Sequence, residues 1–119
     1  MSLSQTQQTF SIMVANLILF ALQEGMGLTF GETYRTEEQQ EIHRRNGASR
    51  VRHSKHQDRL AVDFNLFIDG EYVTDKEKYR KLGEEWEKDG GEWGGRYGVK
   101  KEDYDTKVGW DAGHFQYNG

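Results

Sequence analysis

The sequence predicts an α+β fold in which a small antiparallel sheet is flanked by helices. The predicted elements run in the order helix, strand, helix, strands, helix, strand, which is typical of this class. The clearest of them is a strand over residues 60–68. With 119 residues and neither an internal repeat nor a linker, the chain has room for one core, so we expect residues 1–119 to form a single domain.

The N-terminal element is a predicted helix over residues 5–25. Apolar residues occupy almost every position of residues 12–22, so we expect neighbouring elements to cover this helix on more than one face. Gly25 and Gly27 come next, and glycine accommodates the left-handed conformation that ends many helices.

A strand and a short helix are predicted after this helix. Residues 28–34 alternate in polarity, which is typical of a strand. Thr36 is followed three residues later by Gln39, and this spacing resembles a capping box. We therefore expect a polar helix that begins after Thr36 and ends near Arg45.

The strand at residues 60–68 has one apolar face and one mixed face. Its apolar face carries Leu60, Val62, Phe64, Leu66 and Ile68, and its other face carries Ala61, Asp63, Asn65 and Phe67. Asp69 and Gly70 predict a turn, after which residues 71–73 return as a second strand.

The C-terminal part predicts one more helix and one more strand. Residues 75–89 carry Tyr79, Leu82 and Trp86 at helical spacing between charged residues, which is typical of an amphipathic helix. Glycine and aromatic residues dominate the rest of the chain, and this composition predicts loops before a final strand at residues 114–117.

Composition narrows the classes of function. The formal net charge of −4 disfavours a nucleic-acid surface, which needs clustered lysine and arginine. No cysteine is present, so the chain has neither disulfides nor thiolate metal ligands. The apolar run at residues 10–22 is shorter than the roughly 20 residues of a bilayer span, and we expect no stable membrane insertion. The N-terminus lacks the features of a signal peptide, so we expect synthesis in the cytoplasm.

Asp63 stands out because it lies in an otherwise apolar strand. Burying an unpaired carboxylate costs several kcal/mol, so Asp63 needs a partner. His56 lies just upstream, and His114 lies at the start of the last predicted strand. Two neutral imidazoles and a carboxylate supply three of the four positions of a zinc ion and leave the fourth for water, as in catalytic sites. From spacing alone, histidines with purely structural hydrogen bonds remain the alternative.

The stretches SKHQDRLAVDF and WDAGHF resemble the zinc D-alanyl-D-alanine carboxypeptidase family, which includes VanY-type enzymes and phage L-alanyl-D-glutamate endolysins and shares a metal site with the Hedgehog domain. The stretch TYRTEEQQ resembles a further motif of this family, and together the similarity spans about residues 28–117. The matching positions are Ser54, His56, Ala61, Asp63, Phe64, Asp111, Gly113, His114, Arg35, Thr36 and Gln39. The chain departs from the family at Arg59, where the family usually has glycine. If that position requires a positive φ, arginine is strained there.

The resemblance implies a Hedgehog/DD-peptidase-like fold and one zinc ion held by His56, Asp63 and His114. It also implies that Asp111 is the general base and that Arg35 binds the substrate carboxylate or the developing oxyanion. For Asp111 the alternative is a turn cap, and for Arg35 it is a surface salt bridge.

Three further residues are candidates for support of the site or for contact with substrate. We expect Ser54 and Gln39 to hold the first histidine or the arginine in place. Trp93 could line a peptide groove, although a core position is the alternative for such an aromatic residue.

The function that the resemblance implies is a zinc peptidase that cleaves stem peptides of peptidoglycan. It favours the L-alanyl-D-glutamate bond, with release through a holin as in phage endolysins. A D-alanyl-D-alanine carboxypeptidase is the alternative within the family. An alternative of another class is a catalytically inactive zinc-containing module that only binds peptide or cell wall. A metal-dependent nuclease is a further alternative, but the acidic composition of the chain disfavours it. We expect a monomer.

Overall fold

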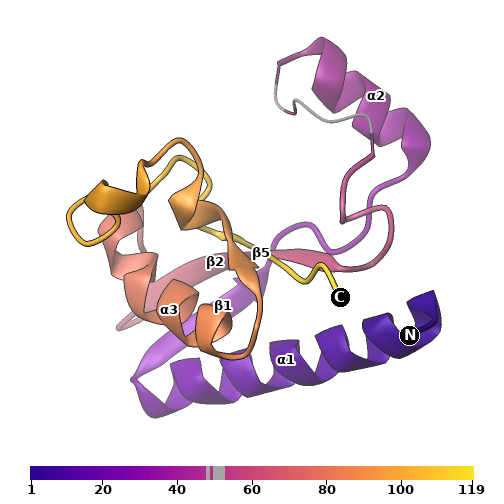
Figure 1. Ribbon diagram of the computed structural model, residues 1–119. Coiled ribbons are helices and arrows are strands. Elements are labelled where there is room, and N and C mark those ends of the chain that lie inside the picture. Colours follow the sequence, from indigo (N-terminus) through magenta and orange to yellow (C-terminus); the bar gives the residue numbers. More distant parts are fainter. Residues whose placement is uncertain (48, 50–52) are drawn as a thin grey trace.

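The centre of the fold is the strand β2 (Ala61–Ile68), and every strand pairing in the described part of the chain is antiparallel. The computed structural model describes residues 1–47, 49 and 53–119. The other strands are β1 (Met26–Phe30), β3 (Glu71–Tyr72), β4 (Glu92–Trp93) and β5 (His114–Gln116). Their order in the sheet is β1-β2-β5-β4, with β3 paired to β2 (Figure 1). The predicted α+β fold with an antiparallel sheet is confirmed.

The helices are distributed around this sheet. The α-helices are α1 (Leu3–Gln23), α2 (Glu37–Arg45) and α3 (Arg80–Lys88), and the 3-10 helices are η1 (Lys76–Tyr79), η2 (Gly94–Arg96) and η3 (Lys101–Asp103). The helix α1 runs beneath the sheet, whereas α2 stands on the opposite side (Figure 1). No helix in the described part of the chain is long and apolar enough to cross a membrane.

The two faces of β2 separate the core from the polar side of the molecule, as the alternation predicts. Val62, Phe64 and Leu66 are buried, whereas Asp63 and Asn65 on the other face are partly exposed. Because β5 pairs with β2 in the register that sets Asp63 opposite His114, both of these side chains point away from the core.

One stripe of α1 packs into the core, and the opposite side faces solvent. The buried stripe is Phe10, Met13, Leu17 and Ala21, at the spacing of a helix face. Ile12, Leu19 and Leu22 are exposed. The expectation that α1 is covered on more than one face is therefore wrong, because the small sheet contacts only one side of it.

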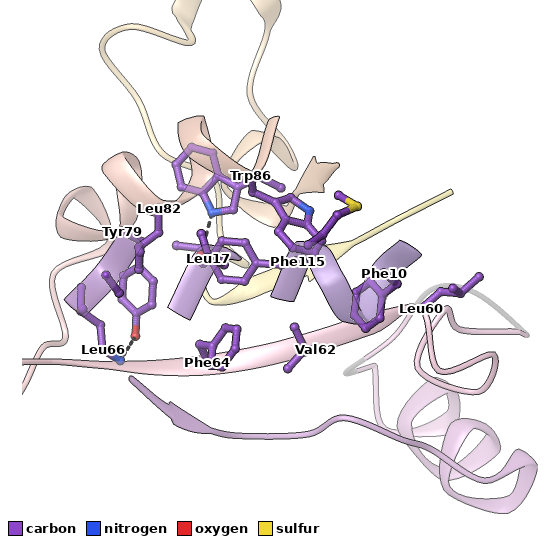
Figure 2. Packing of buried hydrophobic residues seen from close by; sticks show 14 residues of the cluster. Phe10, Leu17, Leu60, Val62, Phe64, Leu66, Tyr79, Leu82, Trp86 and Phe115 are labelled. Atoms are coloured by element: carbon purple, nitrogen blue, oxygen red, sulfur yellow. Dashed lines mark hydrogen bonds between the residues drawn. The ribbon is translucent and has the colours of Figure 1, made fainter. Parts of the chain in front are cut away.

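The core between the helices and the sheet is built around Trp86 of α3 (Figure 2). Its ring contacts Phe10 and Phe115 edge to face, with ring centroids 5.8 Å apart in both pairs. The indole Nε1 donates a hydrogen bond of 2.9 Å to the backbone oxygen of Gln116. Trp86 therefore joins α3 to β5 and holds the strand that carries His114.

The segment between β1 and α2 runs beside the polar face of β2. β1 ends at Phe30, four residues earlier than predicted, but the chain stays close because Gly31 N donates to Asp63 O at 2.7 Å. Asp63 N in turn donates to Glu32 O at 2.8 Å. The predicted capping box then opens α2, since the Thr36 hydroxyl and the Gln39 side chain each accept a hydrogen bond from the other residue's backbone N–H.

The loop that carries His56 contains an arginine whose backbone adopts the left-handed conformation. Arg59 has φ of 57°, so the position where the family has glycine does require a positive φ here. The guanidinium Cζ lies 4.1 Å from the centroid of the Tyr34 ring, which is a cation–π contact. This contact offsets part of the backbone strain that arginine introduces.

The strain at Arg59 predicts that glycine stabilises the protein more than alanine at this position, the reverse of their usual order. Both variants lose the Tyr34 contact, but alanine keeps the left-handed strain whereas glycine removes it. After allowance for the greater backbone entropy of glycine in the unfolded chain, we expect Arg59→Gly to be more stable than Arg59→Ala by about 0.5–1 kcal/mol in urea unfolding. Equal stability, or a more stable alanine variant, would show that the loop does not impose this conformation.

Candidate metal centre

Three side chains from two strands and a loop meet on the polar face of the sheet. Asp63 of β2 and His114 of β5 lie opposite one another in the register, and His56 reaches them from the loop before β2. Asp63 Oδ1 lies 3.3 Å from His56 Nε2 and 3.1 Å from His114 Nδ1. One donor atom from each of the three residues lies within 4.8 Å of the others. The structure thus brings the three predicted ligands together.

The charges at this cluster favour an ionised carboxylate between two imidazoles. Burial by itself would raise the pKa of Asp63, but its hydrogen bonds with His114 and His56 outweigh burial and hold the pKa at about 2. Burial would likewise lower the pKa of His114, yet its contacts with Asp63 and Gln116 raise it above the ordinary value.

The donor atoms fit a metal ion. His56 and His114 are buried, and the ring nitrogen that each presents to Asp63 offers a lone pair when the imidazole is neutral and its proton lies on the other nitrogen. His56 Nδ1 is the one buried side-chain polar atom among the described residues that lacks a hydrogen-bond partner, and it lies 3.9 Å from Glu32 Oε1. Two imidazoles and one carboxylate are the donor set of a zinc site with an open position.

Asp111 stands beside this centre, on the loop that leads into β5. Its Oδ2 lies 3.9 Å from His114 Nδ1, and its backbone oxygen accepts a hydrogen bond of 3.0 Å from His114 N. Burial raises the pKa of Asp111, and the charge of Asp63 adds to this increase against the opposing effect of His114. A carboxylate with a raised pKa next to the open side of the centre is suited to accept a proton.

A cavity of about 730 Å³ surrounds the cluster. Its lining includes Arg35 and His43 from the part of the chain before β2, and Glu92, Tyr97 and Trp110 from the part after it. His56, Asp63 and His114 are themselves part of the lining of this cavity.

Arg35 lines this cavity and is held in place by two partners. Its Nε donates to Glu32 Oε1 at 2.5 Å, and its NH1 donates to Gln40 Oε1 at 2.6 Å. Gln40 is fully buried and also donates to the Ser49 hydroxyl at 2.9 Å. The expected support by Gln39 is wrong, because the Gln39 side chain is exposed and used in the helix cap. Gln40, the next residue, supports Arg35.

Ser54 supports the first histidine, as expected. Its buried hydroxyl accepts a hydrogen bond of 3.1 Å from His56 N, which fixes the backbone of the histidine loop. Trp93, in contrast, has no exposed surface, and its Nε1 donates to Ala112 O at 2.7 Å. The expectation that Trp93 lines a groove is therefore corrected to a core position that anchors the loop before β5.

Three residues of the site had no place in the sequence-based prediction: Glu32, Gln40 and Gln116. Gln116 had a usable signal, because it lies two residues after His114 and hence on the same face of the predicted strand. Glu32 likewise falls in the stretch predicted as a strand. Which of the adjacent glutamines faces Arg35 depends on the rotation of α2, which sequence spacing does not supply.

Comparison with known proteins agrees with this geometry. Residues 47–117 match the model of a protein family described as D-alanyl-D-alanine carboxypeptidase. No curated protein has a significantly similar sequence.

Three solved structures have a similar fold. The L-Ala D-Glu endopeptidase ChiX of Serratia marcescens is 24% identical, with a TM-score of 0.64 over 86% of this chain and 75% of its own. A mutant of the vancomycin resistance D,D-pentapeptidase VanY from the VanB-type cassette, in complex with Zn(II), is 25% identical and has a TM-score of 0.59. The match covers 92% of this chain and 71% of the VanY chain. VanYB in complex with D-alanine-D-alanine is 24% identical and has a TM-score of 0.58. The match covers 92% of this chain and 70% of the VanYB chain.

The three ligands predict one zinc ion per chain, with an affinity that falls as the pH is lowered. Zinc needs neutral imidazoles, and the raised pKa of His114 lets protons compete at pH values above the ordinary 6.5. Competition with a chromophoric chelator across about pH 5.5 to 8.5 measures this dependence.

His53 provides the matched control for this experiment. It lies in the same loop as His56, is exposed, and pairs with Asp58 at 2.8 Å, so His53→Ala should bind zinc like the wild type. His114→Ala should lose the site. A protein that takes up no zinc on reconstitution, or a His114→Ala variant with wild-type affinity, would contradict the assignment.

Proposed function

The chain belongs to the D-alanyl-D-alanine carboxypeptidase family, and we propose that this zinc metallopeptidase of peptidoglycan cleaves the L-alanyl-D-glutamate bond of the stem peptide. The zinc cofactor expected from the sequence is consistent with the His–Asp–His centre and with the Zn(II) complex of the VanY relative. The bond specificity and a role as a phage-type endolysin that reaches the cell wall through a holin are part of the proposal.

The observation that supports the choice of bond is the cavity around the cluster, whose lining extends beyond the three ligands to residues from distant parts of the chain. An endopeptidase must accommodate substrate residues on both sides of the scissile bond. The lining includes Arg35, Tyr97 and Trp110 in addition to the ligands, and the volume of about 730 Å³ has room for more than one substrate residue. A ligand pocket of about 300–1,000 Å³ is the usual size for binding a small molecule or a short peptide segment.

Proton transfer in this reaction falls to Asp111. When bound, zinc supplies a Lewis acid that polarises the peptide carbonyl and lowers the pKa of water. The Asp111 carboxylate, adjacent to the ligand atoms, accepts the proton of the attacking water and then donates it to the leaving nitrogen of D-glutamate. Its raised pKa suits both steps, because the group must give the proton back.

Arg35 contributes positive charge close to the reacting centre, and this charge slightly opposes the increase that burial causes in the pKa of Asp111. Its hydrogen bonds to Glu32 and Gln40 fix it in the cavity wall before substrate arrives. A preorganised cation of this kind stabilises the negative charge that develops on the carbonyl oxygen without a cost for reorganisation.

The alternative is cleavage of the terminal D-alanyl-D-alanine bond, for which the matched family is named. A carboxypeptidase must bind a free carboxylate next to the scissile bond. Arg35 and Lys55 both line the cavity, and either cation is suited to bind this carboxylate. A module that binds without turnover is disfavoured, because the Asp111 carboxylate, whose pKa is raised, lies 3.9 Å from His114 Nδ1.

Digestion of purified peptidoglycan distinguishes these functions. The zinc-loaded protein should release fragments whose new amino termini are D-glutamate, as identified by mass spectrometry. Release of free D-alanine in place of these termini would replace the proposal by the carboxypeptidase alternative. The absence of any new terminus under zinc saturation would support a binding module.

The role assigned to Asp111 predicts a loss of turnover without a loss of metal. Asp111→Asn keeps the shape of the side chain but cannot accept a proton, so kcat should fall by about 10² or more at unchanged zinc content. At saturating zinc, the part of the acidic limb that reports Asp111, whose pKa is raised by burial, should disappear with it.

Asp105 supplies the control, since it is exposed and lies outside the cavity lining. Asp105→Asn should cleave at the wild-type rate. If Asp111→Asn also cleaves at that rate with matched zinc content, Asp111 is not the base.

A further inference from the structure

We propose that Gln116 is a positioning residue that selects the tautomer of His114, so that the Nδ1 lone pair faces the metal position. The inference rests on the metal centre of the proposed function, but it does not depend on which peptide bond is cleaved. Two observations support it: the contact of Gln116 with the histidine, and the fixed polarity of the hydrogen bonds beyond Gln116.

The contact follows from the strand geometry. His114 and Gln116 are two residues apart on β5, so their side chains lie on the same face of the sheet. His114 Nε2 lies 2.7 Å from Gln116 Oε1, while Nδ1 of the same ring faces Asp63. An amide oxygen can only accept, so this contact requires a proton on Nε2.

The orientation of the Gln116 amide is determined by its neighbours. Gln116 Nε2 donates to Asn118 Oδ1 at 2.9 Å, and Asn118 Nδ2 donates to Glu92 Oε1 at 3.3 Å. Glu92 is the partner of Gln116 across β4 and β5, and its other oxygen accepts from the Tyr97 hydroxyl at 2.8 Å. Because a carboxylate only accepts, the series of bonds can run in one direction only, and it leaves Gln116 Oε1 to face His114.

This arrangement opposes an unproductive tautomer. In the neutral ring, the Asp63 carboxylate 3.1 Å away attracts the single proton to Nδ1, where it would occupy the ligand atom. The Gln116 oxygen attracts the same proton to Nε2. Mutation of a residue that accepts a hydrogen bond from the second ring nitrogen of a metal-binding histidine commonly lowers metal affinity by about 10- to 100-fold.

The test compares Gln116→Leu, which removes the acceptor, with Gln116→Glu, which retains one. The backbone of residue 116 stays anchored by Trp86 in both variants, since that bond uses the main-chain oxygen. Two readouts are measured: zinc affinity by chelator competition, and the Nε2–H and Nδ1–H populations of His114 by ¹⁵N–¹H correlation in metal-free protein at a pH where the ring is neutral.

We expect Gln116→Leu to shift the proton toward Nδ1 and to weaken zinc binding by about 10- to 100-fold, and we expect Gln116→Glu to restore both. Unchanged affinity in Gln116→Leu would overturn the proposal. Weaker binding with an unchanged tautomer population would also overturn it, because the role would then be structural only. Neither readout requires peptide cleavage, so a failure of the proposed bond specificity would leave the result interpretable.

Discussion

The register between β2 and β5 is the constraint on which the rest of the site depends. It sets Asp63 opposite His114, and a slip of one residue would turn one of these side chains into the core. Backbone hydrogen bonds at both ends hold the register, from Phe64 N to Gly113 O and from Tyr117 N to Leu60 O. The Trp86 indole fixes the same strand from beneath. Packing in the core thus determines the spacing of the metal ligands above it.

Around this rigid pair, the remaining functional groups come from loops that are each tied to the sheet. The Ser54 hydroxyl holds the backbone of His56, and Gln40 holds Arg35. Trp93 anchors the chain next to Asp111 through its bond to Ala112 O. The catalytic groups therefore stand on loops, but buried polar contacts restrict the freedom of those loops. Such support is what a preorganised centre requires, because small displacements of a base or a ligand reduce the rate.

Much of the fold could be predicted because it depends on local pattern, whereas the ligand set became specific only through the resemblance of its motifs to a known family. The alternation of β2 is visible in the sequence, and so is the histidine that begins β5. The burial of Trp93 depends on a contact between distant segments: a Cβ at Gly83 would lie 2.0 Å from the Trp93 ring, so the indole occupies the space that this glycine leaves. The two-residue strand β4 and the exposed side of α1 likewise result from tertiary packing and leave no period in the sequence.

The central claim is that one zinc ion binds through His56 Nε2, Asp63 and His114 Nδ1. Anomalous diffraction from crystals of the zinc-loaded protein, collected on both sides of the zinc absorption edge, tests it most directly. We predict one peak about 2.0–2.2 Å from an atom of each residue, with the fourth position open toward Asp111. A peak elsewhere, or ligation of His114 through Nε2, would contradict both the metal centre and the tautomer assigned to it.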